Sequence, residues 1–113
     1  MEDLDCKMFV ATDLDRSTLG QRIGTHFGGE VKGKYVSAAT MAIEIRENED
    51  FAPDRCDDAE NGFLFYRLCL EIEPAQGASR VEYVRDVGAI LSLLRSEGWR
   101  ALAACDFEDE LPR

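Results

Sequence analysis

Two kinds of hydrophobic spacing alternate along this chain, and their order restricts the folds that it can adopt. Residues 17–27 and 80–97 carry apolar residues at the three- to four-residue spacing of amphipathic helices. Apolar residues recur at every second position, as in strands that bury one face, in four other segments: 6–12, 41–46, 63–73 and 101–107. The sequence therefore predicts the order strand, helix, strand, strand, helix, strand.

Local signals refine this order around its middle and at the second helix. Ser79 and Glu82 have the spacing of a capping box, which predicts the start of the second helix, and Gly98 is expected to end it. Residues 30–37 are also strand-like, either as a separate short strand or as a bent start of the strand at 41–46.

This order of elements resembles the ferredoxin-like β-α-β-β-α-β arrangement. The resemblance implies an α+β fold with a four-stranded antiparallel sheet in the order 4-1-3-2 and two helices on one face. We further expect strands 1 and 3 to run parallel, with right-handed crossovers. The whole chain, residues 1–113, is predicted to be a single α+β domain with an acidic loop at 47–62 and an acidic tail at 108–113.

The charge balance favours some classes of partner over others. The chain has 23 acidic residues against 13 lysines and arginines, which leaves a net charge of −10. Nucleic acid is a poor partner for such a chain, because affinity for it depends on neutralising phosphates. No apolar run is long enough to span a membrane, and the first ten residues lack the basic start of a signal peptide. We therefore expect a cytoplasmic protein that associates with a basic protein partner and not with a membrane.

The stretch Asp13-Leu14-Asp15 follows the first predicted strand directly. Its aspartates have the spacing of the nucleophile and the acid/base residue in haloacid-dehalogenase-type enzymes. The predicted order of elements does not supply the parallel doubly wound sheet of those enzymes, and Arg16-Ser17 interrupts their Asp-x-Asp-x-Thr pattern. We therefore interpret Asp15 or Ser17 as the N-cap of the first helix, which ends at Gly28, and predict no catalytic residue.

The potential metal ligands do not form a known pattern. The four cysteines, at positions 6, 56, 69 and 105, include no Cys-x-x-Cys pair, and His26 is the only histidine. The acidic run at 54–62 lacks the spacing of an EF-hand loop. We therefore predict no metal site and no cofactor, with the cysteines as free thiols and His26 at the edge of the core.

The expected topology brings three acidic segments to one end of the sheet. With strands 1 and 3 parallel, the amino end, the loop at 47–62 and the exit of the last strand share that end, which we call the acidic pole. Phe51 is expected to act as an apolar anchor among the charges. The predicted contacts with a basic partner are Asp57, Asp58, Asp106, Glu108, Asp109 and Glu110.

The predicted sheet face turned away from the helices is the second candidate surface. Phe9, Phe63, Phe65 and Arg67 fall on this face by their alternation with core positions, together with Glu44, Cys105 and Phe107. Aromatic residues among a few charges are typical of an interface. We predict that this face joins two copies of the chain or receives a partner.

These surfaces favour a non-enzymatic, acidic protein-binding module. An inhibitor, an immunity-type protein or an antitoxin-like protein that neutralises a basic partner fits the charge pattern. One alternative is a small dimeric enzyme with an open-face pocket lined by Phe9, Phe65 and Arg67, in which Arg67 holds an anionic substrate and Glu44 or His26 moves protons. Another alternative is a structural subunit.

Overall fold

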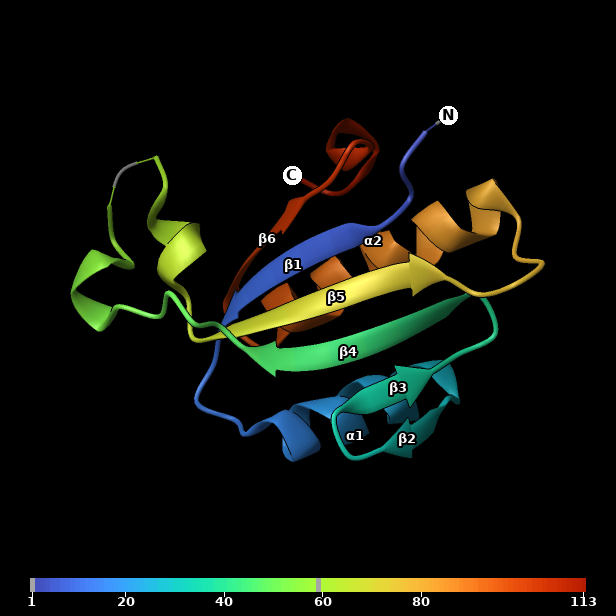
Figure 1. Cartoon of the computed structure of the whole chain (residues 1–113), viewed down its shortest axis with the longest axis horizontal. Helices are drawn as coiled ribbons and strands as arrows, with labels where there is room; N and C mark the ends of the chain where they lie inside the picture. Colours follow the sequence, from blue (N-terminus) through green and yellow to red (C-terminus); the bar gives the residue numbers. More distant parts are fainter. Residues whose placement is uncertain (1, 59) are drawn as a thin grey trace.

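The structure is a computed structural model, and it describes residues 2–58 and 60–113. It is an α+β fold with two α-helices and one sheet of six strands (Figure 1). The elements follow the chain as β1 (Cys6–Ala11), α1 (Arg16–Phe27), β2 (Glu30–Lys32), β3 (Tyr35–Ser37), β4 (Met41–Glu47), the 3₁₀ helices η1 (Pro53–Arg55) and η2 (Gly62–Phe65), β5 (Leu68–Pro74), α2 (Arg80–Ser96), β6 (Arg100–Ala104) and the 3₁₀ helix η3 (Glu108–Glu110).

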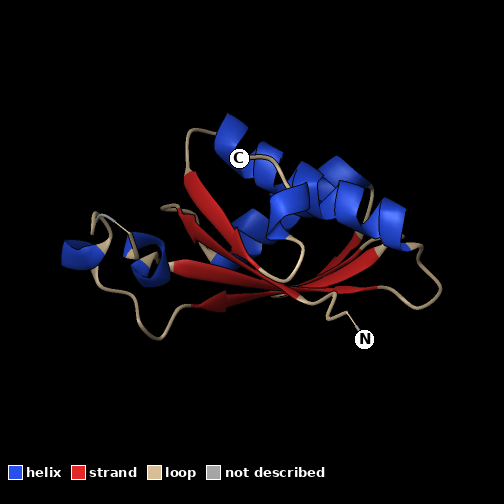
Figure 2. Ribbon diagram, turned by 90° about the horizontal axis from the view of Figure 1, so that it is seen from above, coloured by secondary structure: helices blue, strands red, loops and turns tan. Residues whose placement is uncertain are grey.

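The strands lie in the order β2-β3-β4-β5-β1-β6, and every neighbouring pair is antiparallel. Strands β2 to β5 form a meander, and β1 lies between β5 and β6. Both α-helices cover the same face of the sheet (Figure 2). The other face, which we call the open face, is the one seen in Figure 1.

The predicted α+β class is confirmed, but the predicted count of four strands is wrong, and the ferredoxin-like arrangement is not confirmed. The predicted strands correspond to β1, β4, β5 and β6, which lie in the order β6-β1-β5-β4. The predicted parallel pairing of strands 1 and 3 is also wrong, because β1 and β5 are antiparallel, with Met8 opposite Leu70. After α1 the chain makes three successive reversals, β2 to β5, so β5 runs against β1.

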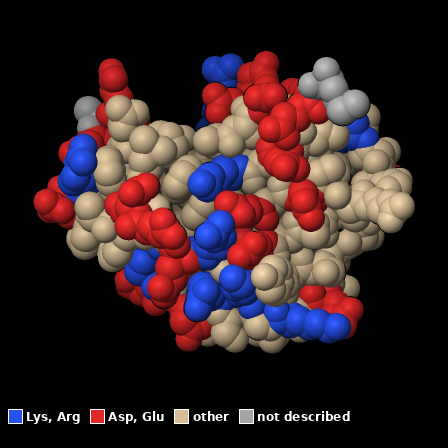
Figure 3. Space-filling model, in the orientation of Figure 1, with Lys and Arg blue, Asp and Glu red and all other residues tan. Residues whose placement is uncertain are grey.

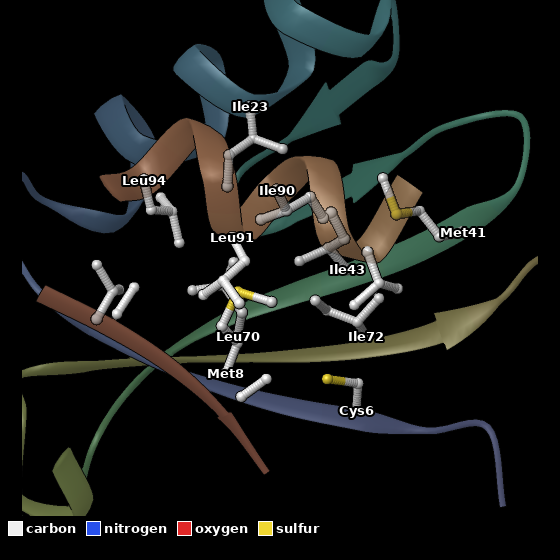
Figure 4. Packing of buried hydrophobic residues seen from close by; sticks show 14 of the residues in the cluster. Cys6, Met8, Ile23, Met41, Ile43, Leu70, Ile72, Ile90, Leu91 and Leu94 are labelled. Carbon is white, nitrogen blue, oxygen red and sulfur yellow. The ribbon is translucent and has the colours of Figure 1, made fainter. Parts of the chain in front are cut away.

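The main core lies between the helices and the sheet (Figure 4). The side chains alternate along β1, β4 and β5, so that every second residue points into this layer. The fully buried residues include Met8 and Val10 from β1, Ile43 and Ile45 from β4, Leu70 and Ile72 from β5, Leu19 and Ile23 from α1, and Ile90, Leu91 and Leu94 from α2.

The predicted helix ends agree with the structure. Asp15 is the N-cap of α1, and its Oδ1 accepts a hydrogen bond from the amide of Thr18 at 2.7 Å. Ser79 is the N-cap of α2, and its Oγ accepts from the amide of Glu82 at 3.1 Å. Helix α1 ends at Gly28, whose φ of 63° lies in the left-handed region that favours glycine.

The chain after β6, residues 105–113, closes one end of the core, and we call it the C-terminal segment. The predicted strand to residue 107 ends at Ala104 instead. Phe107 turns inward, is fully buried, and packs edge-to-face on Tyr83 with the ring centres 5.9 Å apart. The expectation that Phe107 lies on the open face is therefore wrong. Leu111, further along this segment, is also buried.

Residues 48–58 and 60–67 belong to a loop that covers part of the open face, and we call it the covering loop. The predicted strand at 63–73 begins only at Leu68, because Gly62–Phe65 form the 3₁₀ helix η2. Phe63 packs edge-to-face on Phe9 with the ring centres 5.5 Å apart, and Phe9 is buried. The Asn48 side-chain amide donates to the carbonyl oxygens of Leu64 at 2.8 Å and Tyr66 at 2.7 Å, which holds the two ends of the loop together.

Candidate binding groove on the open sheet face

The residues predicted to form one acidic pole lie at two opposite ends of the sheet. Because β4 runs in the same direction as β1, the covering loop with Asp57 and Asp58 lies at the end of the sheet where β1 finishes (Figure 1). The C-terminal segment with Asp106, Glu108, Asp109 and Glu110 lies at the other end, where β1 starts. The single acidic pole is therefore wrong, and the reversed direction of β5 is the reason.

Several of the predicted contact residues already have arginine partners within the chain. Asp57 pairs with Arg100 at 2.6 Å, and Asp58 pairs with Arg55 at 3.3 Å. Glu110 pairs with Arg80 at 2.6 Å. Phe51, the predicted anchor, is 43% exposed. It lines a small hollow of about 280 Å³ at the covering-loop end, together with Thr12, Asp13, Arg67 and Trp99.

The predicted aromatic patch is not an exposed surface. Phe9 lies beneath Phe63, and the Arg55 guanidinium stacks over the ring of Phe65 at 4.0 Å. The Arg67 Nε donates to the carbonyl of Thr12 at 2.9 Å, and its guanidinium also donates to the carbonyl of Leu14. The covering loop thus occupies the surface on which the dimer prediction depends.

The enzyme alternative required an open pocket lined by Phe9, Phe65 and Arg67. These residues do not form such a pocket, because Phe9 is buried and Arg67 ties the covering loop to the end of β1. His26 is exposed on α1, on the helix side of the sheet, and stacks edge-to-face on Phe27. The predicted position of His26 at the edge of the core is therefore wrong, and it lies away from Glu44.

A groove crosses the part of the open face that the covering loop leaves free. Its volume is about 600 Å³, within the size range of ligand-binding sites. Strands β1, β3, β4 and β5, the N-terminal residues and the end of β6 all contribute to its walls. The charged residues that line it are six carboxylates and one lysine: Asp3, Asp5, Glu44, Glu71, Glu73, Asp106 and Lys7.

In one half of the groove the carboxylates are paired with bases of the sheet. Glu44 pairs with Lys34 at 2.9 Å and with Arg46 at 3.8 Å. Arg46 also pairs with Glu71 at 3.3 Å, so it links neighbouring strands β4 and β5. These bases offset the repulsion between Glu44 and Glu71, which lie directly opposite each other across the two strands.

The other half of the groove, which we call its acidic end, has no such compensation. The carboxylates there are Asp3, Asp5, Glu73 and Asp106, and all four residues are exposed. Within residues 2–58 and 60–113, none of them forms an ion pair with a lysine or arginine. In Figure 3, acidic side chains gather beside the N-terminus on this face, whereas bases and acids intermingle over its middle.

The strand register places the segments that carry these carboxylates side by side. Cys6 pairs with Ile72 of β5, and Lys7 pairs with Ala104 of β6. Continued by one residue, the first register sets Asp5 beside Glu73; continued by two residues, the second register sets Asp5 beside Asp106. Like charges directly across neighbouring strands destabilise a sheet. A cationic partner at the acidic end therefore gains attraction and also relieves this repulsion.

Two interactions hold the segments that carry the acidic end. Tyr83 is buried in α2, and its hydroxyl donates to the carbonyl of Leu4 at 2.6 Å, which fixes the backbone between Asp3 and Asp5. Arg80 donates to both carboxylate oxygens of Glu2 at 2.7 Å, and to those of Glu110 at 3.0 and 2.6 Å. The first residues and the C-terminal segment are thereby attached to the start of α2.

The pH dependence of stability tests this double ion pair. Hydrogen bonds from Arg80 hold the pKa values of Glu2 and Glu110 below their ordinary value of 4.5. The two carboxylates therefore stabilise the fold above pH 4.5, and this contribution is lost as the pH falls through their lowered pKa values. We expect Arg80→Met to destabilise the protein near neutral pH and to match the wild type in acid far below pH 4.5.

Urea unfolding of both proteins across this pH range measures the effect. Arg85→Met is the matched control, because Arg85 is an exposed arginine of α2 that pairs with one carboxylate, Asp86, at 3.1 Å. A difference between Arg80→Met and the wild type that stays constant down to strong acid would contradict the assignment.

Comparisons with family models, with curated proteins and with solved structures found no significant match for this chain. No helix within the described part of the chain is long and apolar enough to cross a membrane. Among residues 2–58 and 60–113, no group of three or more histidine, cysteine or acidic side chains is arranged to hold a metal ion.

Sequence reasoning placed Glu44 on the correct face of the sheet, but it did not assemble the groove. Asp3 and Asp5 precede β1, and their position depends on the buried hydroxyl of Tyr83. Glu73 alternates with the core residue Ile72, which does show its face in the sequence. The missing information was the direction of β5, which decides that Glu73 lies beside the N-terminal residues.

Proposed function

We propose that this chain is a non-enzymatic binding protein whose groove receives a lysine- and arginine-rich segment of a partner protein. The observation that supports this most directly is the charge of the groove: its charged lining residues are six carboxylates and one lysine. Four of these carboxylates have no basic partner among the described residues, so their charge is available to a ligand. The net charge of −10 adds long-range attraction for a basic partner.

The shape of the groove favours side chains that are long and cationic. Strand β3 borders the groove opposite the N-terminal residues, through Tyr35 and Ser37. Tyr35 is 51% exposed. Lysine and arginine side chains can lay their methylene stems along such a surface while their charged groups reach the carboxylates. The proposed role is that of a neutralising protein, such as an inhibitor, an immunity-type protein or an antitoxin-like protein, that covers a basic surface of its target.

Fluorescence anisotropy with short peptides tests this proposal. The probe is a fluorescein-labelled peptide of alternating lysine and serine, and the control is a peptide of alternating glutamate and serine. We expect the lysine peptide to bind at about 20 mM salt and to bind at least about tenfold more weakly at about 300 mM salt, because salt screens exposed charges. Equal binding of both peptides, or no binding of the lysine peptide at low salt, would refute the proposed function.

A further inference from the structure

Two of the four cysteines face each other across neighbouring strands. In the antiparallel pairing of β1 with β6, Met8 lies opposite Ala103 and Lys7 lies opposite Ala104. The same register places Cys6 opposite Cys105, the residue at which the chain leaves β6. Both side chains are on the helix side of the sheet, where Cys6 belongs to the core and Cys105 packs against it.

The two thiols are close enough for each to shift the pKa of the other. Opposite residues of an antiparallel pair have Cα atoms about 4.5–5.5 Å apart, within the range of about 4.4–6.8 Å that a disulfide bridges. A bond between these two sulfurs therefore does not require the strands to move apart or to slide.

We propose that Cys6 and Cys105 form a reversible disulfide that joins β1 to the start of the C-terminal segment. This inference rests on the register of β1 and β6 and does not depend on the proposed function of the groove. Both thiols are free in the structure, which is the reduced form of the pair.

Thiol–disulfide exchange with a low-molecular-weight disulfide such as oxidised glutathione gives a balanced reaction. Cys105 is half-buried, whereas Cys6 is 3% exposed, so Cys105 reacts first. Its thiolate attacks one sulfur of the oxidant, forms a mixed disulfide and expels one thiolate. The deprotonated Cys6 then attacks the Cys105 Sγ and expels the second thiol. Two protein thiols are oxidised, the oxidant is reduced to two thiols, and both protons go to these products.

The environment of the pair determines how fast this exchange is. Burial raises the pKa values of Cys6 and Cys105. Little thiolate is therefore present near neutral pH, and the exchange is slow. The pair thus responds to sustained oxidation and not to a brief pulse.

The bond would strengthen the attachment of the C-terminal segment to the core. Phe107 and Leu111, which follow Cys105, fill one end of the core. A link between positions 6 and 105 also closes a loop that contains most of the chain, which restricts the unfolded state strongly. We expect the oxidised protein to melt about 10 °C above the reduced protein.

The experiment equilibrates the full chain in glutathione buffers that run from fully reduced to fully oxidised. Samples are quenched with acid, free thiols are alkylated, and the protein is weighed intact and as proteolytic peptides. We expect the loss of two hydrogen atoms, a linked peptide pair containing Cys6 and Cys105, and complete recovery of both thiols after reduction. Thermal unfolding, followed by circular dichroism, is then compared between the two forms.

Two variants separate this pair from the other cysteines. Cys56 and Cys69 belong to the cluster beneath the covering loop on the open face. A Cys56→Ser, Cys69→Ala variant is expected to retain the linked pair, and Cys105→Ser is expected to lose it. The inference is overturned if the oxidised wild type carries only glutathione adducts, intermolecular links or a different pair, or if the linked form melts below the reduced form.

Discussion

Replacement of Phe107 by alanine lowers the free energy of unfolding by about 3–5 kcal/mol. Phe107 is fully buried, and its ring packs edge-to-face on that of Tyr83. The substitution removes most of this side chain and leaves a cavity between α2 and the end of β6, which the fixed strands cannot fill. Urea unfolding of the wild type and the variant measures the difference.

Phe51→Ala is the matched control for this experiment. Phe51 is 43% exposed and belongs to the covering loop at the opposite end of the sheet. The same chemical change there is expected to cost less than about 1 kcal/mol. Equal losses for the two variants would show that the C-terminal segment does not close the core.

The position of Phe107 also illustrates what the sequence does not reveal. In residues 101–107, the pattern Ala-Leu-Ala-Ala-Cys-Asp-Phe does not decide which of the two sets of alternate residues faces the core. The structure buries Ala101 and Ala103 and leaves Leu102 41% exposed. The small alanines belong to the same core cluster as the buried residues of α2. Because leucine is more hydrophobic than alanine, hydrophobicity alone assigns Leu102 to the core. This assignment places Phe107, which alternates with Leu102, on the opposite face.

Features that depend on neighbouring residues in the chain were predictable. The caps at Asp15 and Ser79 follow from side chains that satisfy the first amides of their own helices. The alternation of Met41, Ile43 and Ile45 in β4 is equally local, because each residue faces the core in turn.

The covering loop shows the opposite case. Residues 63–66 have an apolar pattern that is compatible with a strand, but distant contacts decide their structure. At Gly62 the chain passes so close to the loop that a β-carbon would lie 2.3 Å from the carbonyl oxygen of Cys56. The side chains of Asn48 and Arg67 then bind backbone carbonyls that are distant in the sequence. No local pattern encodes these partners.

The sequence predicted an acidic surface but not where on the sheet its carboxylates lie. An acidic surface follows from the composition, yet the topology decides which carboxylates meet. The β2-β3 hairpin and the antiparallel pairing of β1 with β5 send the acidic loop to one end of the sheet. Asp106 remains beside Asp5 at the other end, because β6 is antiparallel to β1 as expected.

Reversal of two charges at the acidic end of the groove is expected to abolish most of the proposed binding. Glu73 and Asp106 lie on either side of Asp5, and both residues are exposed. The fold should therefore tolerate the substitutions Glu73→Lys and Asp106→Lys. Each reversal replaces an attraction for the basic segment by a repulsion. A loss of about 1.4 kcal/mol per site corresponds to about 100-fold weaker binding of the lysine peptide by the double variant at low salt.

The matched control carries the same change in net charge at the other end of the sheet. Asp50→Lys and Asp54→Lys alter two exposed residues of the covering loop, which do not line the groove. Long-range attraction through net charge weakens equally in both double variants, whereas contact within the groove is lost only in Glu73→Lys, Asp106→Lys. We therefore expect the control to bind within about threefold of the wild type at about 150 mM salt, where distant charges are screened. If the two double variants lose affinity equally at that salt concentration, the partner responds to overall charge, and the groove is not its binding site.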